Sequence, residues 1–246
     1  MKAGLLCLAM CAAVTPKAHA QMTWTDKAFV NVTGGAQAGS RSLETERSFD
    51  LYEEQARVAS SQDVKGGAFF DISAGYKVWR NLALGVGYSR SGSNSNATVA
   101  ASIPDPVVHD SPRAISASVT GLKHTESAVH LMGVWMVPVT DKIDVGLSAG
   151  PSIFMVTQGM PGTLTVTEPG PSVTNSTAVN VDKTTVGIHF GVDVTYLVTK
   201  RWGVGGLARY TWGSVGLEGA SDKLTVGGFQ IGGGVRLRFS TLSFWP

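Results

Sequence analysis

Eight stretches of this chain alternate apolar residues with polar or small ones. The clearest is the last, residues 225–239, where apolar side chains alternate with glycines, Gln230, Arg236 and Arg238. A period of two is typical of a β-strand with unlike faces. The expected strands cover residues 29–38, 67–78, 82–91, 126–137, 143–154, 185–197, 202–212 and 225–239. The chain is therefore expected to be all-β.

The connectors between these strands are alternately long and short. The long ones are residues 39–66, 92–125, 155–184 and 213–224, and the short ones are 79–81, 138–142 and 198–201. In an antiparallel up-and-down structure, this order places every long connector at the same end. Outer-membrane barrels have short periplasmic turns and long extracellular loops. Weak alternation around residues 48–56 indicates that the first hairpin extends beyond the membrane.

Two architectures fit eight such strands, and they differ in which face meets the surroundings. A soluble up-and-down barrel of the lipocalin type buries its apolar face, whereas a membrane barrel exposes it. Glycines gather on the polar face. Glycine weakens a strand and has no use on a face in contact with water, but a narrow barrel interior requires small residues. Aromatic residues fall near the ends of the runs, as in membrane girdles: Phe70, Tyr76, Trp79, Tyr88, Trp135, Phe154, Tyr196, Trp202, Tyr210, Trp212 and Phe239. These features favour the transmembrane barrel.

Residues 1–20 have the features of a secretory signal peptide. A short apolar stretch follows Lys2, and Ala18-His19-Ala20 fits the cleavage rule, so the mature chain would begin at Gln21. Lipidation of Cys11 is disfavoured by the methionine before it. Both cysteines lie in this segment, so we expect no disulfide or thiol chemistry. Its removal takes two of the 20 basic residues and leaves 18 bases against 18 acids, which gives no indication of nucleic-acid binding.

Eight strands, a signal peptide and the run 235–239 together resemble the OmpA-type outer-membrane β-barrel family. The run 232–239 also resembles the terminal signal read by the barrel assembly machinery, with Gly234, Leu237 and Phe239 at its glycine and apolar positions. Two features depart from that signal: Gly232 stands at its polar position, and residues 240–246 follow its aromatic end. The resemblance implies one barrel domain over residues 21–246, a place in the bacterial outer membrane, contact with its lipid and a monomeric state.

The polar face carries charged and histidine side chains that the barrel would enclose. These are Asp71, Lys77, Glu126, His130, Asp144, His189, Asp193, Arg209, Arg236 and Arg238. In a dry, narrow lumen each charge needs a partner. We therefore expect a network across the lumen that links Asp193 and Asp144 to Arg236 and Arg238. Such a network would act as a plug, and the alternative is a narrow small-solute pore.

Residue patterns give little support for catalysis or metal binding. The histidines are scattered, and a polar lumen lacks the apolar pocket that a lipid A acyltransferase or deacylase needs. No HxH, HExxH or CxxC spacing and no phosphate-binding glycine motif is present, so we expect no metal and no cofactor.

The long connectors are the remaining place for function. Their candidate residues are Glu44, Glu46, Arg47, Asp105, His109, Asp110, Arg113 and residues 161–174. The sequence thus favours a structural or surface-interaction role toward an extracellular ligand that it does not identify. A pore is the first alternative, and a lipid-modifying enzyme is the second.

Overall fold

The computed structural model describes residues 23–167, 172–216 and 223–240. Within these residues the chain forms ten antiparallel strands. They are β1 (Ala28–Ala38), β2 (Ser40–Leu51), β3 (Glu54–Lys65), β4 (Ala68–Trp79), β5 (Leu82–Ile103), β6 (Arg113–Thr140), β7 (Ile143–Thr167), β8 (Ser172–Leu197), β9 (Trp202–Val215) and β10 (Leu224–Phe239). The expected signal peptide, the start at Gln21 and the tail 241–246 lie outside the described residues. No helix in the described part of the chain has the length and hydropathy needed to cross a membrane.

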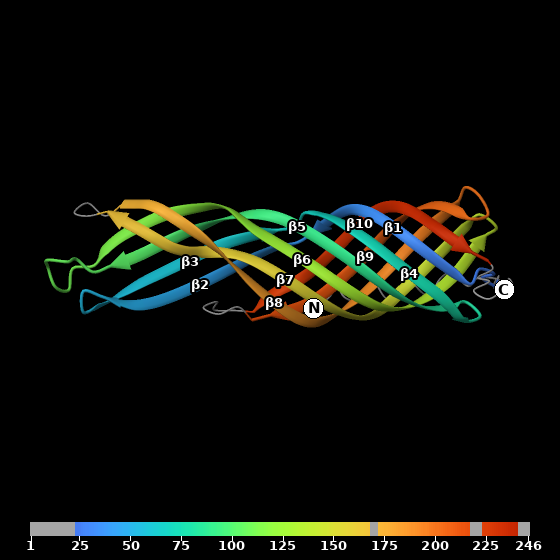
Figure 1. Ribbon diagram of the computed structural model, residues 1–246, viewed down its shortest axis with the longest axis horizontal. Helices are drawn as coiled ribbons and strands as arrows, with labels where there is room; N and C mark the ends of the chain where they lie inside the picture. Colours follow the sequence, from blue (N-terminus) through green and yellow to red (C-terminus); the bar gives the residue numbers. More distant parts are fainter. Residues whose placement is uncertain (1–22, 168–171, 217–222, 241–246) are drawn as a thin grey trace, which may run out of the picture.

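Eight of the strands close into a barrel (Figure 1). Neighbours pair in the order β5-β4-β1-β10-β9-β8-β7-β6, and a further pairing of β5 with β6 completes the ring. The first and last barrel strands pair antiparallel from Ala28 opposite Phe239 to Ala38 opposite Phe229. The eight-stranded up-and-down barrel expected from the alternation is confirmed, and its termini meet in one continuous ladder.

The first three long connectors are mostly strand, and the sequence indicated this only for the first, around residues 48–56. β2 and β3 form a hairpin that continues β1 and β4 beyond the barrel, in the connector where weak alternation was seen. The prediction of loops over residues 92–125 and 155–184 was wrong. β5 and β6 stay paired as far as Ile103 and Arg113, and β7 and β8 stay paired as far as Thr167 and Ser172. Serine, threonine, asparagine and glycine dominate there and hide the two-residue period.

We call the part of the structure beyond the barrel rim the extension: residues 40–65, 94–123, 159–167 and 172–180. Pairing between β6 and β7 ends at His124 and Gln158. Beyond that level the strands separate into a four-stranded sheet, β2-β3-β5-β6, and the β7–β8 hairpin (Figure 1). The first three long connectors therefore form two ordered β-units on the side assigned to the cell exterior.

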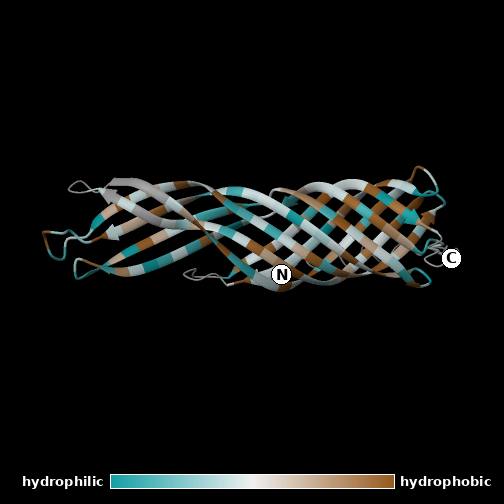
Figure 2. Cartoon of the chain, viewed as in Figure 1, coloured by the Kyte–Doolittle hydropathy of each residue, from teal (hydrophilic) through white to brown (hydrophobic). Residues whose placement is uncertain are grey.

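The barrel exposes its apolar face. Many outward apolar side chains on the barrel strands are at least 36% exposed, among them Val32, Ile72, Leu84, Val86, Leu131, Leu147, Val192, Val204, Ile231 and Val235. Inward positions hold buried polar groups such as Asp71, His130 and Arg209. Figure 2 shows the apolar colouring concentrated on the barrel and mixed colouring on the extension. A continuous exposed apolar band suits lipid and not water, so the soluble alternative does not apply.

The two faces exchange character in the extension. There the inward side chains are apolar and buried, as for Val99, Val119 and Leu122, whereas Thr98 and Ser118 point outward and are exposed. The exchange coincides with a β-bulge between β5 and β6. The bulge is seen in the register, which moves from Ser95 opposite Leu122 to Ala97 opposite Val119. β6 therefore carries one extra residue there, and its inward positions change from even to odd numbers.

Gly121 makes the bulge possible. Its φ of 74° lies in the left-handed region that favours glycine. Its backbone N–H donates to Asn96 Oδ1 on β5 at 3.4 Å.

The aromatic residues lie where two girdles would place them, with one exception. Tyr76, Trp79, Tyr196 and Trp202 are about half exposed near the short turns, and Phe70, Tyr210 and Trp212 lie toward the extension. Phe154 was wrongly assigned to the outer belt, because it is 2% exposed and faces inward. Alternation along β7 places it on the same face as Ser152 and Val156, where it packs in an apolar cluster at the barrel mouth.

Replacing Gly121 with alanine should lower the free energy of unfolding by about 1 kcal/mol, because a Cβ is disfavoured at positive φ. Gly133→Ala is the matched control: Gly133 is on the same strand without a positive φ, and a Cβ there would lie 3.9 Å from its nearest neighbour. Denaturant unfolding of the barrel in lipid vesicles measures both. Equal losses in the two variants would contradict the role given to the bulge.

Candidate functional site

The middle of the lumen is filled by Arg209 of β9. Its Nη2 donates to Asp71 Oδ2 at 2.7 Å, and its Nε donates to Gln230 Oε1 at 2.8 Å. Gln230 in turn donates to Gln37 Oε1 at 2.7 Å. Arg209 is 4% and Asp71 2% exposed. A Cβ on Gly191 would lie 2.8 Å from Ser148 Oγ and 3.4 Å from the Arg209 side chain, so glycine leaves room there for Ser148 beside the arginine.

Glu126 of β6 lies at the extracellular end of the lumen and accepts four hydrogen bonds. The donors are Gln37 Nε2 at 2.8 Å, Arg41 Nη1 at 2.8 Å, His124 Nε2 at 2.9 Å and the backbone N–H of Gly227 at 3.0 Å. Arg41 also donates to the Gly227 carbonyl. Gln37 joins this group to Gln230, so one hydrogen-bonded network runs from Asp71 to the barrel mouth.

An apolar cluster at the mouth includes residues from the first hairpin and from β7, β9 and β10. Leu43 of β2 is packed there with Phe154, Val215 and Val226. Leu43 and Arg41 follow directly after β1, at the point where the chain leaves the barrel wall. The start of the extension therefore contributes both a charged and an apolar side chain to the closure of the lumen.

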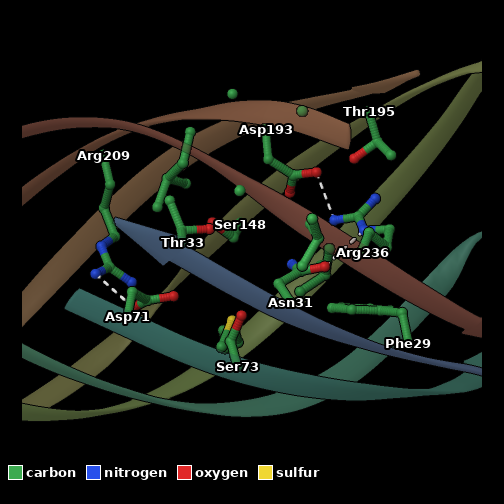
Figure 3. Close-up of a pocket in the computed structure, with 17 residues that line it drawn as sticks. Phe29, Asn31, Thr33, Asp71, Ser73, Ser148, Asp193, Thr195, Arg209 and Arg236 are labelled. Atoms are coloured by element: carbon green, nitrogen blue, oxygen red, sulfur yellow. Dashed lines mark hydrogen bonds and ion pairs between the residues drawn. The ribbon is translucent and has the colours of Figure 1, made fainter. Parts of the chain in front are cut away.

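Two further arginines form ion pairs toward the periplasmic end. Arg236 Nη2 lies 2.5 Å from Asp193 Oδ1, and Arg236 Nε donates to Asn31 Oδ1 at 2.7 Å. Arg238 Nη1 lies 3.1 Å from Asp144 Oδ2, and its Nη2 pairs with Asp26. The structure thus places Arg236 against Asp193 and Arg238 against Asp144. Figure 3 shows the Arg209–Asp71 and Arg236–Asp193 pairs at two separate positions in the lumen.

The segment before β1 closes the periplasmic mouth. Trp24 is 1% exposed and packs with Phe29, Met132 and Met136. Its backbone N–H donates to Asn81 Oδ1 at 3.0 Å, and its carbonyl accepts from Lys77 Nζ at 2.7 Å. Lys77 is therefore bonded to a carbonyl and not to an acid. No sequence pattern indicated Trp24 or Asp26, since both precede the first alternating run.

His130 and His189 belong to a separate polar group. Ser89 Oγ lies 2.9 Å from His130 Nε2, and Ser152 Oγ lies 2.8 Å from His130 Nδ1 and 2.9 Å from His189 Nδ1. A hydroxyl between imidazoles can act as a nucleophile only where a substrate reaches it. His130 and His189 are 0% and 1% exposed, so the group instead ties the neighbouring strands β5, β6, β7 and β8 together.

The remaining space in the lumen is small. A cavity of about 40 Å³ lies between the two central ion pairs and is lined by Asn31, Asp71, Asp193, Arg209 and Arg236, among others (Figure 3). That volume holds a few water molecules. Among the described residues, no group of three or more histidine, cysteine or acidic side chains is arranged to hold a metal ion. The enclosed residues therefore form a filled lumen with buried, paired charges.

The fold and this lumen define a transmembrane β-barrel with a packed polar interior. The sequence matches the family described as the outer membrane protein beta-barrel domain over residues 3–239, and the chain belongs to that family. It is accordingly a bacterial outer-membrane protein. A search of curated proteins finds no match.

Three solved structures with a similar fold are of low sequence identity. Neisserial surface protein A (NspA) is 15% identical with a TM-score of 0.45, over 86% of this chain and 97% of that one. OprG from Pseudomonas aeruginosa is 10% identical with a TM-score of 0.45, over 87% and 97%. The outer membrane protease OmpT from Escherichia coli is 11% identical with a TM-score of 0.42, over 91% and 100%. At these values the similarity carries no inference of function.

Removing one partner of the Arg236–Asp193 pair should cost about 3–5 kcal/mol of unfolding free energy, because the other charge is left buried without its counterion. The double variant Asp193→Ala/Arg236→Ala should lose less than the two single losses added together. Arg201→Ala, in an exposed short turn, is the control and should change little. Denaturant unfolding in vesicles gives all four values. Strictly additive losses would show that the two side chains are not coupled.

Proposed function

We propose that the protein is a surface-binding protein of the outer membrane, in which a non-conducting barrel anchors an extension that contacts extracellular ligands. The observation that carries the proposal is the construction of the extension. It has apolar clusters of its own: Ala97, Val99, Val119 and Leu122 in one, and Ala56, Ile103 and Ile115 in another. A stretch of chain that served only as a connector would need neither.

Contacts between the hairpin tips support this role. Glu54 Oε1, at the end of the β2–β3 hairpin, accepts from the backbone N–H of Asp110 at 3.1 Å and lies 2.6 Å from His109 Nδ1. In the same β5–β6 connector, Asp105 accepts from the N–H groups of Val107 and Val108 at 2.8 and 3.1 Å. These bonds, with Arg113 nearby, lower the pKa of Asp105. Two connectors are thus held together as one surface.

The lumen supports the anchoring role more than the pore. Its arginines are paired with carboxylates, its extracellular mouth is lined by Leu43 and Phe154, and its periplasmic mouth by Trp24. The polar lining with its 40 Å³ cavity is the observation that favours a small-solute pore. A lipid-modifying enzyme is less well supported, because the serine–histidine group faces the sealed interior and not lipid.

The wild-type protein in planar bilayers should show no stepwise conductance above that of protein-free bilayers, because Arg209 and Glu126 are hydrogen-bonded across the interior of a narrow lumen. Liposome-swelling assays with small sugars should likewise match lipid-only controls. A reproducible unit conductance that changes with Asp193→Ala or Arg236→Ala would favour the pore and contradict the anchor.

Replacing residues 45–60 by an Asn-Gly turn should abolish surface binding while the barrel remains intact, because Leu43 and Gln62 stay paired. Cells displaying the full or shortened chain would be tested on arrays of matrix proteins and glycans. A heat-modifiability gel would verify folding. The control is Asp141→Asn/Lys142→Gln in a periplasmic turn. Equal binding by the full and shortened chains would count against a surface-binding role for the first hairpin.

A further inference from the structure

The extension contains a partly open, largely apolar cavity of about 290 Å³. It lies between the four-stranded sheet and the β7–β8 hairpin and is distinct from the small cavity in the lumen. Its lining residues are Thr45, Arg47 and Phe49 of β2, Val58 and Ser60 of β3, Val99 of β5, and Met160, Pro161 and Gly162 of β7. All of them lie beyond the barrel rim.

The size and walls of this cavity suit a single hydrocarbon chain. Phe49, Val99 and Met160 supply apolar surface from three strands. The volume is about twice that of an engineered 150 Å³ cavity known to bind benzene, and it lies at the lower end of the roughly 300–1,000 Å³ range of small-molecule pockets. It accommodates one alkyl chain of moderate length and is too small for a diacyl lipid.

Arg47 is the charged residue in the lining. The inward arginines Arg41, Arg209, Arg236 and Arg238 each pair with a carboxylate. Among the described residues Arg47 forms no ion pair and no side-chain hydrogen bond. The neighbouring Thr45 and Ser60 hydroxyls bond each other at 2.6 Å, so they do not engage it. An exposed cation beside an apolar cavity is complementary to an anionic head group on an apolar tail.

Phe49 marks where the cavity opens. It lines the cavity, yet 49% of its surface remains exposed. It lies eleven residues beyond Ala38, the last residue of the first barrel strand. A ligand that covered Phe49 would remove apolar surface from water, which favours binding. The opening lies beside the extension and not in the apolar band of the barrel, so the ligand would enter from the surrounding water.

We propose that this cavity binds a free single-chain amphiphile with an anionic head, of the medium-chain carboxylate class. The chain lies against Phe49, Val99 and Met160, and the head group is bound by Arg47. This inference rests on the proposed function, since it names a ligand class for the surface that the extension forms. The acyl chain of a membrane lipid is the other source of the same chemistry, and the test separates the two.

The test uses the full chain in lipid nanodiscs, because detergent alkyl chains would compete for the cavity. Calorimetric titration with decanoate, corrected with empty nanodiscs, should show saturable binding of one molecule per chain. Arg47→Gln should weaken that binding about tenfold to a hundredfold, the effect of losing a charge-assisted hydrogen bond. Decanol should bind more weakly to the wild type and equally to both proteins. Arg57→Gln is the control, because Arg57 is exposed on the outer face of the same hairpin.

A decanoate carrying a terminal diazirine then locates the site. Light should attach it to peptides of β2 and β7 that include Phe49 and Met160, and Val99→Trp, which fills the cavity, should abolish this labelling. If Val99→Trp fails the heat-modifiability test for folding, the decanoate affinities of Arg47→Gln and Arg57→Gln decide whether the cavity is the binding site. Labelling confined to the outward face of the barrel would show uptake from the bilayer and overturn the proposal.

Absence of saturable binding, or equal binding by wild type and Arg47→Gln, would also overturn the cavity assignment. The surface-binding role would stand in that case if the shortened hairpin still lost its binding to the arrays. Conductance in bilayers would contradict the proposed anchor without altering the decanoate result. Failure of either idea is therefore distinguishable from failure of the other.

Discussion

The pairing of β1 with β10 is the interaction on which the rest of the structure depends. Hydrocarbon offers no partner for a backbone N–H or carbonyl, so a sheet that spans it must have no free edge. The ladder from Ala28–Phe239 to Ala38–Phe229 provides that closure. Closing with only eight strands leaves an interior just wide enough for side chains. The outward face must then suit lipid, and every polar group on the inward face must find a partner within the lumen.

The filled lumen follows from that narrowness. Arg209, Arg236 and Arg238 each come from a strand with glycines close by, and each contacts an acid from a different strand. Buried pairs of this kind add little net stability but hold their elements in a fixed relation, because separating them exposes an unpaired charge. The barrel is thereby suited to be a rigid support. The bulge at Gly121 then lets the same strands continue into water with their apolar side chains turned inward.

The spanning strands were predictable because lipid and lumen impose opposite demands on alternate residues. That contrast also placed Arg236 near Asp193, since both lie on inward faces near the short turns. The extension strands were missed because alanine occurs on both faces, as at Ala100 and Ala101, and because the bulge at Gly121 shifts the period of two along β6. Trp24, Asp26 and Arg41 could not be assigned, since their roles depend on which segments fold across the two mouths. Phe154 could have been assigned correctly, because alternation along β7 places it on the inward face with Ser152.

The central claim is that one strand faces lipid outward in the barrel and water outward in the extension. A nitroxide scan along β5 in vesicles tests it most directly, with oxygen and a water-soluble nickel chelate as collision partners. Nitroxides at even positions from Leu82 to Tyr88 should collide mainly with oxygen, and those at even positions from Asn94 to Ser102 should collide mainly with the chelate. Nitroxides at odd positions should be accessible to neither. The account would be contradicted if odd positions in the barrel were accessible to the chelate. It would also be contradicted if even positions remained accessible mainly to oxygen as far as Ser102.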